Sequence, residues 1–211
     1  MRFRDKRVLT IKTKDDMLRI LEKGNSIKEY KKGVKITVYN KMEKNYSYTL
    51  EENPGKNMEF DPDYTPAQML KMGVFEGKYL NDCVLEFPKE WFLNAMDKLS
   101  PEGANPELNK FKVKSRLNLD VWLDYGWVPH GNIAKKYAIL STNNPDERGW
   151  FQWFCRYWMG RRHEIDDVQM KRWRAFNRHV HQILKNCKKG DLECRPIQRQ
   201  SLLQWAHKCD I

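Results

Sequence analysis

Residues 148–162 read RGWFQWFCRYWMGRR, so that six aromatic and four arginine side chains share fifteen positions. Aromatic rings fill protein cores or stack on nucleobases, and arginine pairs with phosphate. The segment is therefore either a buried helix with a charged rim or part of a nucleic-acid surface. Helical spacing favours the core for the four aromatics that share one side, Trp150, Phe151, Phe154 and Trp158. The functional signal then lies in the arginines and in one or two tryptophans.

Helical patterns surround this segment. Apolar periodicity and cap residues predict helices over 145–159, 165–187 and 196–207. Earlier in the chain, proline at a first helical position predicts helices over 65–73 and 89–99. Asn118 caps a further short helix that ends at Tyr125. The C-terminal part of the chain is therefore expected to be mainly helical.

The N-terminal part has a different pattern. It predicts a helix over 15–24 and two strands, 34–39 and 46–50, around a polar turn at 40–45. Residues 53–64 contain two prolines, one glycine and three acids without periodicity, which predicts a linker. The predicted fold class is mainly α, and α+β overall. Its predicted divisions are a small α+β module at 1–52, a linker at 53–64 and a helical domain at 65–211.

The composition is that of a folded chain with an excess of positive charge. The 211 residues carry a formal net charge of +11 and have a pI near 9.4. Lysine and arginine gain affinity for polyanions by releasing condensed counterions, which favours nucleic acid as the partner, DNA over RNA. The alternative is that the charge serves only solubility.

Cysteine usage and hydropathy bear on the compartment. The five cysteines are odd in number and scattered, with no secretory leader before them, which predicts reduced thiols and a cytoplasmic location, the host cytoplasm for a viral protein. No apolar run reaches the roughly 20 residues that would span a bilayer, so we expect no membrane contact. The oligomeric state is left open.

The predicted phosphate contacts are arginines and lysines too numerous to be buried together. They belong to the segment above, to the helix that follows it and to the start of the last helix, where backbone amides also favour phosphate. Trp150 or Trp153 would stack on bases. A solvated basic face is the alternative. The predicted contacts are Arg148, Arg156, Arg161, Arg162, Lys171, Arg172, Arg174, Arg195 and Arg199, and Arg178 belongs to the same candidate surface.

The sequence leaves open whether the protein is an enzyme. Lys78 beside Asp82 could support nucleophilic chemistry, although a surface salt bridge explains the pair as well. Asp166 and Asp167 could hold a divalent ion, although acids at a helix start also cap it. If there is a catalytic site, these four residues would line one cleft. The C-terminal His and Cys residues match no zinc spacing, so no metal site is predicted and no cofactor is indicated.

The chain also contains five short motifs between residues 60 and 205: GVFEGKY at 73–79, EFP at 86–88, RGWFQWFCR at 148–156, GRR at 160–162 and DD at 166–167. They resemble an uncharacterised protein family of phages and of fungal and other eukaryotic genomes. The resemblance implies no activity, but it implies a viral or mobile-element origin. The leading hypothesis is a nucleic-acid-binding protein. This hypothesis includes an enzyme that modifies or processes nucleic acid. The rival is a structural or interaction protein, such as a virion component or an inhibitor of a host factor.

Overall fold

The computed structural model of the protein describes residues 11–38, 46–116 and 144–211. The predicted turn at 40–45 and the predicted short helix from Asn118 to Tyr125 lie outside the described residues. Within them the chain is mainly α-helical, with one two-stranded sheet, which confirms the predicted fold class.

The described helices are of two kinds. The α-helices are α1 (Lys14–Leu21), α2 (Pro66–Met72), α3 (Lys89–Leu93), α7 (Trp150–Met159), α8 (Asp166–Phe176), α9 (Arg178–Asn186) and α10 (Pro196–Gln204). The single turns of 3₁₀ helix are η1 (Ile27–Glu29), η2 (Phe75–Gly77), η3 (Val84–Glu86), η4 (Met96–Lys98), η5 (Pro106–Leu108) and η6 (Val113–Ser115).

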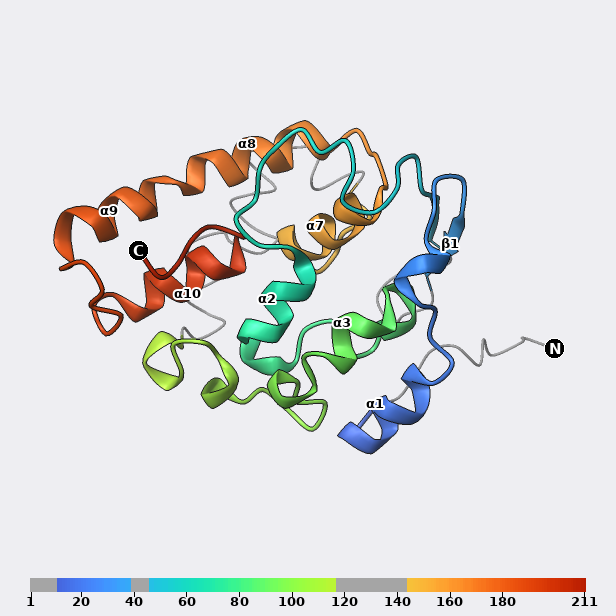
Figure 1. Ribbon diagram of the computed structural model, residues 1–211, viewed down its shortest axis with the longest axis horizontal. Coiled ribbons are helices and arrows are strands. Elements are labelled where there is room, and N and C mark those ends of the chain that lie inside the picture. The colour runs from blue at the N-terminus through green and yellow to red at the C-terminus, as the bar shows by residue number, and fades with distance from the viewer. Residues whose placement is uncertain (1–10, 39–45, 117–143) are drawn as a thin grey trace.

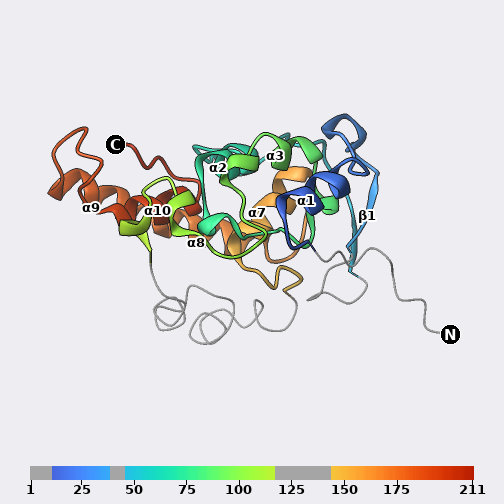
Figure 2. The ribbon, with the colours of Figure 1, turned by 90° about the horizontal axis from the view of Figure 1, so that it is seen from below.

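The sheet pairs β1 (Lys35–Thr37) with β2 (Ser47–Thr49) in antiparallel register, with Ile36 opposite Tyr48. The molecule is elongated, with α7 in its middle, the strands at one end and α9 and α10 at the other (Figure 1). The view from below shows the same order along the long axis (Figure 2).

Capping explains where the predicted helices begin. Thr13 and Asp16 form a reciprocal capping box at α1, and Thr65 and Gln68 form another at α2, which has proline at its first position. Helix α7 begins later than predicted, because the backbone of Gly149 (φ 95°, ψ −159°) is not helical and its N–H closes a turn onto Asp146 O. The residues from 145 to 149 therefore form a turn that leads into the helix.

Helix α7 is the centre of the hydrophobic core. Nine of its ten residues are buried, and only Trp158 is partly exposed. The helix stops at Gly160, whose left-handed conformation (φ 106°) is one that glycine adopts without strain. The Gly160 carbonyl accepts hydrogen bonds from the amides of Glu51 and Glu52, at 2.8 and 3.1 Å. This contact fixes the segment after β2 to the end of α7.

One continuous core includes all three predicted divisions of the chain. Met17 and Leu50 of the N-terminal part belong to the same cluster of buried residues as Trp153. Phe60, in the predicted linker, is 8% exposed and its ring lies 5.7 Å from that of Trp153. The predicted boundaries at 52/53 and 64/65 therefore do not separate two cores.

Two of the five cysteines differ from the expectation of reduced thiols. Cys187 and Cys194 are joined by a disulfide, which contradicts that part of the prediction. Cys83, Cys155 and Cys209 are free and buried.

Gly160→Ala is expected to destabilise the protein by more than about 2 kcal/mol, because a left-handed alanine is strained and its methyl group would collide with backbone. A Cβ placed at Gly160 would lie 2.0 Å from Glu52 O. Chemical denaturation measures the effect. Gly33→Ala is the matched control, since Gly33 also has positive φ (89°) but a Cβ added there would meet nothing within 4 Å. Equal losses in the two variants would contradict the role given to the contact with Glu52.

Candidate nucleic-acid interface

Two of the predicted phosphate-binding arginines lie inside the core. Arg156 is 0% exposed, and its guanidinium donates to both carboxylate oxygens of Glu86, at 2.6 and 3.1 Å, and to Asp146 Oδ1 at 2.9 Å. Arg161 is 1% exposed and donates to the two oxygens of Asp146, at 2.8 and 2.6 Å. These arginines neutralise buried carboxylates. The prediction that they bind phosphate is incompatible with their burial.

Asp146 is the shared anion of this network. Burial alone would raise its pKa, but the charges of Arg161 and Arg156 outweigh burial and hold the pKa of Asp146 below its ordinary value of 3.8. Tyr46 and Tyr48 from the hairpin complete the network, the first accepting from Arg161 at 3.2 Å and the second donating to Glu86 at 3.0 Å. The network therefore links α7 to the sheet and to η3.

The two predicted stacking tryptophans are also buried. Trp150 is 4% exposed and its indole N–H donates to the backbone oxygen of Gln169, at 3.2 Å. Trp153 is 0% exposed and its indole N–H donates to Asp166 Oδ1, at 2.7 Å. Both acceptors belong to α8. The tryptophans therefore hold α8 against α7 and do not offer a ring to a base.

Two further predicted contacts bind backbone carbonyls of the protein. Arg199 is 0% exposed and donates to four of them, those of Asp191, Cys194, Cys209 and Ile211. Its burial is incompatible with the predicted phosphate contact at the start of α10. Arg162 is half-buried over the ring of Tyr157 and donates to the carbonyls of Lys56 and Asn57. It closes the segment after β2 onto α7.

The four predicted catalytic residues lie in separate surroundings. Asp82 forms an ion pair with Arg148 at 2.6 Å, and Lys78 is exposed. Asp166 accepts from Trp153 and from the His163 amide, and burial raises its pKa above the ordinary 3.8 although both hydrogen bonds oppose the shift. Asp167 is exposed in the first turn of α8. Among the described residues no hydrogen bond or ion pair joins the first pair to the second, so nothing there assembles them into one cleft.

The remaining predicted contacts lead to an exposed surface. Helices α8 and α9 meet at Asn177, whose backbone is right-handed helical, and run along one edge of the molecule (Figure 1). We call residues 166–186 the basic arm. From 171 to 190 the sequence has seven lysines and arginines and no acidic residue.

Five side chains of the arm share one exposed face, and we call them the basic stripe. Their spacing alternates three and four residues, so at about 100° per residue they fall within an arc of about 80° over roughly 21 Å of helix. Asp167 precedes them on this face, where it complements the helix dipole. All five are exposed: Lys171, Arg174, Arg178, His181 and Lys185.

The stripe faces solvent because the opposite face of the arm is packed against the body. The ring of Phe176 stacks on Trp205 at 4.8 Å, and that of Trp173 stacks on His207 at 4.7 Å. Arg172 lies with its guanidinium over Trp205, at 5.2 Å, and donates to Gln169, so it belongs to this packed side. These contacts fix which face of the arm remains free.

The basic stripe keeps its positive charge, because the described carboxylates do not pair with it. Within residues 11–38, 46–116 and 144–211, no carboxylate forms a salt bridge with Lys171, Arg178 or Lys185. Arg174 donates to the carbonyl of Glu59, at 3.5 Å. Arg195 is exposed at the start of α10, where it donates to Gln198. The sequence predicted Lys171, Arg174 and Arg178 for the phosphate surface; His181 and Lys185 complete the stripe.

The described residues give no sign of a metal centre or a membrane span. They contain no group of three or more His, Cys, Asp or Glu side chains that could hold a metal ion. None of their helices is both long and apolar enough to pass through a bilayer. Comparison of the chain with protein-family models, with curated proteins and with solved structures gave no match. The resemblance to a phage and fungal family therefore stays a prediction.

Asp146→Asn is expected to destabilise the protein by about 3–5 kcal/mol, because it leaves two buried guanidinium groups with a single carboxylate between them. Equilibrium denaturation at pH 7 measures the loss. The control is Glu193→Gln, which removes the carboxylate of the exposed Lys114–Glu193 pair and should leave stability almost unchanged. Similar stabilities for the wild type and Asp146→Asn would show that the network is not needed to hold the core.

Stability is expected to fall as the pH is lowered below about 6.5, because burial holds the pKa of His207 under its ordinary value of 6.5. At a pH between the lowered pKa of folded His207 and the ordinary pKa of the unfolded chain, the unfolded chain binds more protons than the folded one, so unfolding is favoured. His163 and His179 act in the same direction. His207→Phe keeps a ring against Trp173 and should give a shallower decline in stability from pH 7 to pH 5 than the wild type shows. An unchanged slope in His207→Phe would contradict this role.

Proposed function

We propose that the protein binds nucleic acid, DNA rather than RNA, with the basic stripe of α8 and α9 lying against the phosphates. The observation that carries the proposal is the alignment of Lys171, Arg174, Arg178, His181 and Lys185 on one exposed helical face. Lysine and arginine that approach phosphates release condensed counterions, and this gain does not depend on base sequence. The expected mode is therefore backbone contact.

The charge balance of the whole chain supports this choice of surface. The charges of Arg156 and Arg161 and of their buried partners Glu86 and Asp146 sum to zero, so the net charge of +11 comes from other residues of the chain. The stripe is a place where cations face solvent without a salt bridge from the described carboxylates. The tryptophans of α7 act indirectly, since their indole groups fix α8.

Cytoplasmic location and a viral or mobile-element origin belong to the same proposal. Both rest on the sequence: the first on the odd number of scattered cysteines, three of which are free thiols, and the second on the motif resemblance. A protein partner with an acidic surface is the rival, because it would also be attracted to the stripe. The described side chains suggest no catalytic step, so we propose binding alone.

A triple variant that replaces Lys171, Arg178 and Lys185 with glutamine should weaken binding to duplex DNA. The slope of log K against log salt is negative, and each lost phosphate contact should reduce its magnitude by about 1, the three together by about 3. Fluorescence anisotropy with labelled duplexes measures the affinity and its salt dependence. The salt concentration is varied from about 50 to about 200 mM, because phosphate contacts make affinity fall steeply over this range. Duplex RNA in parallel tests the preference for DNA.

The matched control replaces three exposed lysines near the other end of the molecule, Lys23, Lys28 and Lys31, with glutamine. It changes the net charge by the same amount, so it should bind nearly as the wild type does. Equal losses in the two triple variants would mean that net charge, and not the stripe, attracts DNA. No binding of any oligonucleotide at low salt would reject the proposed function and favour the acidic protein partner.

A further inference from the structure

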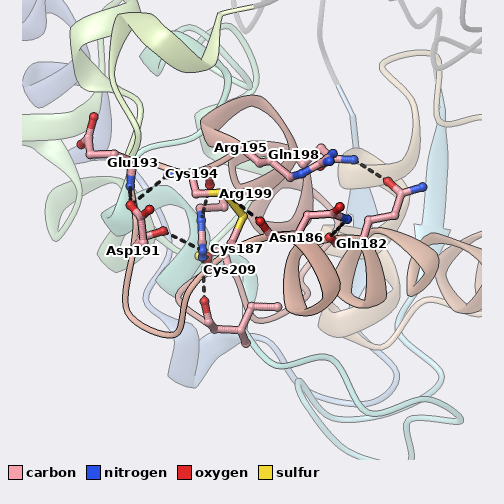
Figure 3. Close-up of a disulfide and its surroundings, with 11 residues drawn as sticks. Gln182, Asn186, Cys187, Asp191, Glu193, Cys194, Arg195, Gln198, Arg199 and Cys209 are labelled. Carbon is pink, nitrogen blue, oxygen red and sulfur yellow. Dashed lines mark hydrogen bonds between the residues drawn. A yellow bond between two sulfur atoms is a disulfide. The ribbon is translucent and has the colours of Figure 1, made fainter.

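The basic arm ends at a disulfide. Cys187 is the residue that terminates α9, and Cys194 lies two residues before Pro196, the first residue of α10. The bond closes the loop between the two helices, as Figure 3 shows. Lys188 and Lys189 are exposed in this loop. A covalent link thus joins the free end of the arm to the body.

The loop is also held by hydrogen bonds that do not involve the sulfur–sulfur bond. Arg199 donates to the carbonyls of Cys194 and Asp191, at 2.8 and 2.9 Å. The Asp191 carboxylate in turn accepts from the amides of Glu193 and Cys194, at 3.1 and 3.2 Å (Figure 3). These contacts do not reach α9, so they hold Cys194 beside Arg199 of α10 whether or not the sulfur–sulfur bond is present. Cys194 therefore keeps a fixed position to which Cys187 can return when the bond re-forms.

The two cysteines differ from the other three in their surroundings. Cys83, Cys155 and Cys209 are buried, and burial raises the pKa of each of these thiols. Cys187 and Cys194 are only half-buried. Thiol–disulfide exchange should therefore be confined to this pair.

We propose that Cys187 and Cys194 form a reversible redox site, whose disulfide fixes the end of α9 to α10. The oxidant is a low-molecular-weight disulfide such as glutathione disulfide. One cysteine thiolate attacks it, forms a mixed disulfide and releases one glutathione thiolate; the second cysteine then attacks the mixed disulfide and releases the other. The protein loses two electrons, and the two thiol protons go to the two glutathione molecules.

The end of α9 depends on this bond because little else holds it. Ile183 is the one buried residue among the nine of the helix. Side-chain hydrogen bonds to α10 run through Gln198, which lies 2.5 Å from Gln182 and 3.4 Å from His179. Helix ends with few buried contacts open easily. Reduction should therefore loosen the last turn of α9, which carries Lys185.

The test compares the full chain with a Cys187→Ser/Cys194→Ser double variant in glutathione buffers of graded ratio. Mass spectrometry after thiol alkylation follows the bond, and amide hydrogen exchange follows residues 181–189. In the wild type the bond should form and break across the series, with at least tenfold faster exchange in the reduced form. The double variant retains the three buried cysteines and should exchange fast throughout, with no response to the buffer.

Three results would overturn the proposal. A bond that survives reduced glutathione in the folded protein would be a permanent structural link, and one that never forms in glutathione disulfide would not be a redox site. A bond that interconverts without any change in hydrogen exchange at 181–189 would not fix the arm.

An effect on DNA affinity is also expected, and this part rests on the proposed function. The oxidised form should bind duplex DNA several-fold more tightly than the reduced form, because Lys185, Lys188 and Lys189 are then held in place. Equal affinities of the two forms would overturn this part. If neither form binds any oligonucleotide, the proposed function fails, while the bond and exchange measurements still decide the redox site.

Discussion

The fold depends on one shared carboxylate, that of Asp146, which lies between two buried guanidinium groups. Taking Arg156 and Arg161 out of water is costly, and only close anions can offset the cost. Asp146 serves both, and Glu86 completes the neutralisation of Arg156. Replacing either acid would leave a buried cation without enough compensation. Residues that are distant in sequence must therefore meet at one point, which restricts how α7, η3 and the hairpin can be arranged.

Once α7 is fixed, its polar edges determine where the basic arm lies. The indole N–H groups of Trp150 and Trp153 need acceptors in the core, and they find them on Gln169 and Asp166 of α8. These bonds set the rotation of α8, so that Phe176 faces Trp205 and the stripe faces solvent. The aromatic segment and the basic surface are thus two consequences of one packing arrangement. The residues that would contact phosphate belong to a different helical segment from the residues that place them.

Much of the fold could be predicted from local signals, but the roles of the arginines could not. The helices predicted over 15–24 and 65–73, the hairpin strands and the helical C-terminal part are confirmed, because each depends on residues close in sequence. The burial of Arg156 depends on Glu86, seventy positions earlier, and no local pattern indicates that pairing. Phe60 lies in the core although its segment has no periodicity, because its partner Trp153 is also distant in sequence. For the stripe a local signal does exist, the alternating spacing of three and four residues from Lys171 to Lys185, but the predicted phosphate surface includes only its first three members.

The proposed binding surface and the proposed redox site occupy the same helix, and this has a thermodynamic consequence. If the oxidised form binds DNA more tightly by some factor, linkage requires that bound DNA favour the disulfide over the two thiols by the same factor. The coupling acts through a short path, because Cys187 directly ends the helix that carries Arg178, His181 and Lys185. No rearrangement of the core is needed, since the Asp146 network and the α7–α8 bonds lie at the other end of the arm. Ordering of the last turn of α9 would then couple DNA binding to disulfide formation, and disulfide formation to DNA binding.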